Sequence, residues 1–128
     1  GFARMVDFDK GHFNGRRALL RLAGSTPRRR LVQMEVGKDK PAANALVYHR
    51  KKKEVGMVTS ALWSPTCKQN IAYAWLDAPY GETESGDLWV EIYLQKEIRW
   101  QRRMERCRIA EKPFFVHQRR SATPPGDY

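Results

Sequence analysis

The stretch VGMVTSALWSPTCKQNIAYAWL, residues 55–76, decides the fold of this chain. Two segments rich in β-branched and aromatic residues, 54–62 and 70–76, flank the polar run SPTCKQ (64–69). Ser-Pro followed by polar residues is typical of a turn, and the flanking composition is typical of strands. We therefore predict an antiparallel hairpin here, although Ser60, Ser64, Cys67 and Tyr73 are also residue types that catalysis uses.

The rest of the chain after Gly24 has the same character. Apolar and polar residues alternate in three further short segments, and turn-forming or charged runs separate them. These predicted strands are LVQMEV (31–36), ALVYH (45–49) and LWVEIY (88–93), with connections PAAN (41–44), RKKK (50–53) and PYGETESG (79–86). The spacing predicts five to seven short antiparallel strands, and hence a small barrel or sandwich.

The two ends of the chain differ from this middle part. Residues 2–9 (FARMVDFD) predict an edge strand, and residues 13–23 (FNGRRALLRLA) predict a short helix. Asn14 is the expected N-cap of that helix, with Phe13 packing just before it, and Gly24 ends it. The tail SATPPGDY (121–128) is expected to be disordered.

Residues 98–109 (IRWQRRMERCRI) fit two structures. In a helix, Trp100, Met104 and Cys107 share one face, and arginines form another. In a strand, Ile98, Trp100 and Met104 share a side that Arg102 interrupts. The local pattern favours the helix.

Composition bounds the function. The chain has 128 residues with 41% hydrophobic residues, and its 24 Lys and Arg against 14 Asp and Glu give a net charge of +10. It fits one globular domain, with Cys67 and Cys107 expected as free thiols and no zinc or other metal site. No apolar run reaches the ~20 residues of a membrane span. The chain does not begin with Met, so we expect a fragment.

Catalysis by this chain alone has little support. A serine or cysteine nucleophile needs a base, and His12, His49 and His117 lie in no recognisable catalytic motif. Thr59 and Ser60 are better explained as strand hydroxyls that satisfy backbone groups. No catalytic residue is predicted. Basic residues interleaved with Trp89, Tyr93 and Trp100 leave one alternative open, a free-standing basic β-barrel that binds nucleic acid.

Four motifs in order resemble the C-terminal barrel of the glycine cleavage T-protein (aminomethyltransferase) family. They are DFDKGHFNGRRAL, VGMVTSALWSP with NIAYAWL, GDLWVEI and EKPFFV, and together they span roughly residues 1 to 116. The first resembles the family's strand-to-helix entry through Lys10, Phe13, Gly15, Arg16, Ala18 and Leu19. The chain departs from the family pattern at His12, Asn14 and Ala61, where the pattern has an acidic residue, Ile and Gly.

The resemblance implies a mainly β fold, a small antiparallel Greek-key type β-barrel of six to seven strands with one short N-terminal helix. It places a strand, not a helix, at 98–109, and it implies that Val55, Val58, Ile71 and Ala74 pack inside a barrel wall. Residues 1–26 would end a preceding domain and form a connecting helix, 27–116 would form the barrel, and 117–128 a flexible tail.

The resemblance also implies a function. Family members bind tetrahydrofolate between three domains and transfer a one-carbon unit, with the catalytic aspartate and most folate contacts upstream of this region. The chain would then close the folate site, pack on the missing N-terminal domains, and be inactive alone. Related dehydrogenases and demethylases end in the same domain.

Two further expectations follow from the resemblance. Arg119, with Arg120 beside it, would be the cofactor-binding residues of this fragment, reaching the carboxylates of folate. The location would be cytoplasmic, or the mitochondrial matrix in a eukaryote. Separately, Phe2, Met5, Phe8 and Phe13 predict an exposed apolar patch toward the missing domains, with possible self-association.

Overall fold

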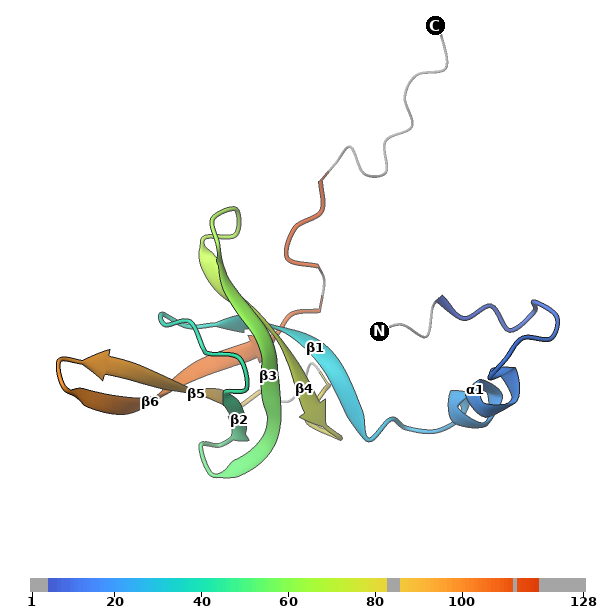
Figure 1. Ribbon diagram of the computed structural model, residues 1–128, viewed down its shortest axis with the longest axis horizontal. Helices are drawn as coiled ribbons and strands as arrows, with labels where there is room; N and C mark the ends of the chain where they lie inside the picture. Colours follow the sequence, from blue (N-terminus) through green and yellow to red (C-terminus); the bar gives the residue numbers. More distant parts are fainter. Residues whose placement is uncertain (1–4, 83–85, 112, 118–128) are drawn as a thin grey trace, which may run out of the picture.

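The structure is a computed structural model that describes residues 5–82, 86–111 and 113–117 (Figure 1). The described chain forms one short helix and six antiparallel strands. The helix is α1 (Arg16–Ala23), and the strands are β1 (Arg29–Val36), β2 (Leu46–His49), β3 (Lys53–Ser64), β4 (Gln69–Asp77), β5 (Leu88–Lys96) and β6 (Arg99–Ile109).

The six strands close into a barrel in the order β1-β4-β3-β2-β5-β6. Hairpins join β2 to β3 and β3 to β4, and β4 then lies beside β1. This is a Greek-key arrangement. β6 closes the barrel by pairing with β1 through Val36 and Cys107. The predicted fold class, a mainly β antiparallel barrel of six to seven strands with one short helix, is confirmed.

The core follows from the alternation of side chains along the strands. β4 buries Ala72, Ala74 and Leu76, and β5 buries Leu88, Val90 and Ile92, all at 3% exposure or less. The other buried apolar residues are Val32, Met34, Val36, Val47, Val55, Val58 and Cys107.

The predicted hairpin of 55–76 is present as β3 and β4, which pair from Gly56–Leu76 to Ser64–Gln69. Its turn occupies Pro65–Lys68, and the strand register shifts between Val58 and Ser60. Gly56 is required at its position, because a Cβ there would lie 2.1 Å from the carbonyl oxygen of Trp75. The close approach in this hairpin is therefore at Gly56.

The amino-terminal expectations need correction. Residues 6 and 7 have no regular structure and 8–10 form a bend, so the described part of 2–9 contains no strand. The predicted helix is present but begins at Arg16. Its N-cap is Gly15 rather than Asn14, because the chain enters the helix through a left-handed conformation with φ of 93° at Gly15. Leu20 and Leu22 are 45% and 62% exposed on α1, which lies to one side of the barrel (Figure 1).

The local helical pattern at 98–109 is wrong, and the strand implied by the family resemblance is correct. β5 pairs with β6 over the whole length of β5, from Lys96–Arg99 to Leu88–Cys107. The outer part of this pair projects beyond the barrel as a two-stranded ribbon, which we call the β5–β6 ribbon (residues 91–105; Figure 1). Ile92 at the root of the ribbon is buried in the core, but most side chains from Tyr93 to Arg103 are exposed, so this part does not show the alternation of a half-buried strand.

Candidate functional site

The outer side of β1, β4 and β3 carries apolar side chains. Trp75 pairs with Leu31 on one side and Met57 on the other, and Ile71 pairs with Leu62. Residues paired across neighbouring strands point to the same side of the sheet. Leu62 is 53%, Tyr73 43% and Trp75 41% exposed. We call this the outer apolar face: Leu31, Met57, Leu62, Ile71, Tyr73 and Trp75.

One of the four residues predicted to pack inside the barrel lies on the outer apolar face instead. Val55, Val58 and Ala74 are buried as predicted, but Ile71 is only partly buried and points outward. Ala72, its neighbour in sequence, takes the inward position opposite Met34. The physical reason is the alternation of β4, in which Ala72, Ala74 and Leu76 share the inner side.

The segment that follows β6 lies against one end of this face. Phe114 borders a small cavity of about 20 Å³ together with Leu62, Ile71 and Tyr73. The Cys67 thiol lies 3.4 Å from the Phe114 carbonyl oxygen and donates a hydrogen bond to it. Phe115 and Val116 remain more than half exposed and extend the apolar surface. The apolar patch predicted at the amino terminus is less exposed than expected. Met5 is exposed, but Phe8 and Phe13 are partly buried. Phe2 lies outside the described residues.

The hydroxyl groups of the 55–76 hairpin serve the backbone. The Thr59 hydroxyl donates a hydrogen bond of 3.1 Å to the Tyr73 carbonyl oxygen. The Ser64 hydroxyl oxygen accepts one of 3.2 Å from the amide of Cys67 and so holds the turn. These contacts explain Thr59 and Ser64 without a nucleophilic role.

A buried carboxylate anchors the root of the β5–β6 ribbon. Glu91 is 8% exposed, and its Oε2 accepts hydrogen bonds from the Tyr48 hydroxyl at 3.3 Å and from Arg102 Nε at 2.7 Å. Burial and the neighbouring Glu91 raise the pKa of Tyr48, and a hydrogen bond to Glu91 raises the pKa of Tyr93. The same carboxylate raises the pKa of Arg102. The buried Glu91 carboxylate is thus neutralised by the Arg102 guanidinium, and this ion pair joins β5 to β6 at the root of the ribbon.

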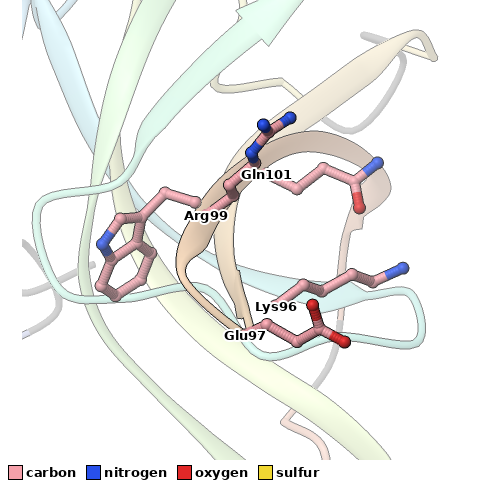
Figure 2. A pocket seen from close by; sticks show the side chains of 5 residues that line it. Lys96, Glu97, Arg99 and Gln101 are labelled. Atoms are coloured by element: carbon pink, nitrogen blue, oxygen red, sulfur yellow. The ribbon is translucent and has the colours of Figure 1, made fainter.

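Two hollows border the ribbon. One, of about 460 Å³, lies between residues 40–45 and the ribbon residues Tyr93 and Trp100. The other, of about 730 Å³, lies at the tip and is lined by Lys96, Glu97, Arg99, Trp100 and Gln101. Figure 2 shows Lys96 and Gln101 extending to the same side of the ribbon at this tip.

Several predicted features can be placed and others cannot. Cys67 and Cys107 are both free, and burial raises the pKa of the Cys107 thiol to about 12. Arg119 and Arg120, the predicted folate contacts, lie outside the described residues. Within the described ranges, no group of three or more His, Cys, Asp or Glu side chains is arranged to hold a metal ion. In the same ranges, no helix has the length and apolar character to cross a bilayer.

Sequence reasoning missed the Glu91 cluster and the outer apolar face. One signal for the cluster was present: Arg102 interrupts the apolar side of β6, and the structure shows that it does so to pair with Glu91. The outer apolar face was hidden because a run such as IAYAWL places apolar residues at both alternating positions, which is also how a strand buried on both sides appears.

The fold and the outer apolar face together define a closed barrel domain that presents one uncovered apolar side. The family described as glycine cleavage T-protein C-terminal barrel domain matches residues 29–115 of the chain. The chain belongs to this family.

Known relatives agree with this assignment. An aminomethyltransferase of Moorella thermoacetica is 34% identical over 118 residues, which cover 90% of this chain and 29% of that protein. One of Alkaliphilus metalliredigens is 40% identical over 100 residues, covering 76% of this chain and 26% of that protein. The chain thus spans less than a third of the length of either relative.

A solved structure shares the fold. The glycine cleavage system aminomethyltransferase T from Bartonella henselae superposes with a TM-score of 0.66 at 19% sequence identity. The superposition covers 84% of this chain and 28% of that one. Like the sequence relatives, it matches this chain with a part of its length.

Proposed function

We propose that this chain is the C-terminal domain of a tetrahydrofolate-dependent aminomethyltransferase or demethylase-like protein. The single observation that carries the proposal is the match to the family's C-terminal barrel domain over residues 29–115. The relatives named as aminomethyltransferases match over only 29% and 26% of their lengths, which supports a role as one part of a larger protein. They give the nucleic-acid alternative no support.

The role of the domain in that protein would be to pack against the upstream domains and close the folate site. The outer apolar face supports this, because large apolar side chains at Trp75, Tyr73 and Leu62 are exposed on one side of β3 and β4, and exposed apolar patches mark interaction sites. The chain supplies packing surface, and the catalytic aspartate and most folate contacts would come from upstream. The chain alone is therefore expected to be inactive. The proposed location is the cytoplasm, or the mitochondrial matrix in a eukaryote.

A chimaeric enzyme tests the proposal. The matched segment of the Moorella thermoacetica aminomethyltransferase is replaced by this chain, and tetrahydrofolate-dependent aminomethyl transfer is measured. The chimaera should be active, while the isolated chain should show no turnover. A chimaera that unfolds cooperatively like the parent but has no activity would contradict the proposal, as would turnover by the isolated chain.

Arg119 and Arg120 are proposed to contact the glutamate carboxylates of folate. A guanidinium can bind a carboxylate through two parallel hydrogen bonds. In the active chimaera, Arg119→Ala should raise the Michaelis constant for tetrahydrofolate by an amount equivalent to roughly 1–3 kcal/mol, with a smaller change in the turnover number. If Arg119→Ala and the double alanine variant both leave folate affinity unchanged, this assignment is wrong.

A further inference from the structure

We propose that the free edge of β6 in the β5–β6 ribbon binds an extended acidic segment of a separate polypeptide, which adds to the ribbon as a third strand. This inference is independent of the proposed function, which uses the outer side of β1, β4 and β3. The occupant is defined by two properties of the edge, its unpaired backbone and its charge.

The backbone of the ribbon is open on its β6 side. β6 pairs with β1 only from Cys107 to Ile109, and among the described residues no strand lies beside Arg99–Glu105 on that side. Lys96 and Arg99 flank a two-residue turn, so they form a hydrogen-bonded pair, and the pairs then alternate along the ribbon. The alternation turns the amide and carbonyl groups of Trp100, Arg102 and Met104 outward.

An observed hydrogen bond supports this pattern. By the same alternation the carbonyl group of Arg106 also points outward, and it accepts a hydrogen bond of 3.1 Å from the Gly37 amide. The next outward groups toward the tip, at Met104, Arg102 and Trp100, continue this edge. A third strand of about five residues can therefore pair there, as extended peptides do at exposed sheet edges.

The charge of the edge selects an acidic occupant. Residues 99–106 contain four arginines and one glutamate. Arg102 is held by Glu91, and Arg103 by Asp39 and Glu105. The Arg99 side chain forms no hydrogen bond or ion pair with any other described residue, and it is exposed. Acidic side chains on an added strand would lie opposite these arginines, and opposite charges stabilise cross-strand pairs.

Two other occupants fit less well. A second copy of this chain would place arginines against arginines if two β6 edges paired, which is destabilising. A nucleic acid would leave the outward amide and carbonyl groups unused, and it would meet the aliphatic Ile98, which is 97% exposed at the tip. The ribbon also projects away from α1, on the other side of the barrel (Figure 1), where it is accessible to a separate partner. Trp100, 68% exposed, offers a typical anchor for such a contact.

The test uses defined peptides and the purified 128-residue chain. An acetylated octapeptide of alternating glutamate and valine is titrated against the chain at low and moderate salt. Two versions of the peptide, each methylated at alternate backbone nitrogens, keep the charge but block one pairing edge. A single-stranded oligonucleotide of equal charge and an alternating lysine–valine peptide serve as comparisons.

The unmodified acidic peptide should bind, and one of the methylated versions should bind at least about tenfold more weakly because it loses main-chain hydrogen bonds. Arg99→Glu should also weaken binding by about tenfold, whereas Arg17→Glu on α1 should not. Equal binding of all three acidic peptides would overturn the proposal, as would tighter binding of the oligonucleotide or no binding of the acidic peptide at all.

Discussion

Two hairpins of this barrel have nearly the same length but opposite surroundings. The β3–β4 hairpin has a strand on each side, since β2 pairs with β3 and β1 pairs with β4. The β5–β6 ribbon is paired at its root and, in the described structure, extends without strand neighbours beyond Glu91 and Glu105. Both hairpins contribute to the core, but the β5–β6 hairpin does so only at its root, through Leu88, Val90, Ile92 and Cys107. We expect the two to respond differently to substitution.

The largest contrast should come from removing apolar side chains. Leu76 is fully buried on the inner side of β4, so Leu76→Ala should lower the free energy of unfolding by about 2–5 kcal/mol. Trp100→Ala on the ribbon removes a larger side chain that is 68% exposed, and it should change stability by about 0.5 kcal/mol or less. Urea denaturation of both variants measures the difference. Equal losses would mean that the ribbon belongs to the core.

Removing the charge of Glu91 should affect the β5–β6 ribbon more than the β3–β4 hairpin. Glu91→Gln keeps the shape of the side chain but removes the charge that holds Arg102, at a cost of roughly 1–3 kcal/mol. Amide hydrogen exchange should speed up in the β5–β6 ribbon and stay unchanged in β3–β4. Uniform acceleration across the barrel would show that Glu91 supports the whole fold instead.

A smaller effect should appear at high pH. Burial raises the pKa of Cys107 to about 12, so the folded chain keeps this thiol protonated where an unfolded chain ionises it. The contribution of this thiol to the free energy of unfolding is fully present below the unfolded thiol pKa of about 8.5. It is lost progressively as the pH rises toward 12. Between pH 8.5 and 9.5 the native chain should lose about 1 kcal/mol more than Cys107→Ala does. Parallel pH profiles for the two proteins would show that Cys107 does not titrate this way.

The same comparison explains what the sequence could predict. The turn at 64–69 and the alternation of Val32, Met34 and Val36 follow from local chemistry, so most strands were predicted within a few residues. The ribbon was not, because arginines at 102, 103 and 106 mimic one face of a helix when no core imposes an alternating pattern. The family resemblance resolved that segment where the local pattern could not.

The candidate site was predicted less well than the fold. The inward or outward direction of Ile71 depends on the strand register, which a run of apolar residues leaves open. The pairing of Glu91 with Tyr48 and Arg102 joins three strands, and no local spacing in the sequence reports such a contact. The prediction of Asn14 as the helix N-cap was wrong for a local reason, since Gly15 takes that position in a left-handed conformation.

The most direct test of the account uses two tryptophans, one from each hairpin. Trp75 lies on the outer apolar face and Trp100 on the ribbon, and both are substantially exposed. Each is changed to Ser in the chimaeric enzyme, and tetrahydrofolate-dependent transfer is measured alongside thermal unfolding of the isolated chain. We expect Trp75→Ser to reduce activity at least about tenfold, the effect of losing one large interface anchor. Trp100→Ser should leave activity unchanged, and both isolated variants should stay folded. Full activity in a folded Trp75→Ser enzyme, or its loss in Trp100→Ser alone, would contradict the proposal that the outer apolar face of β1, β4 and β3 packs against the rest of the protein.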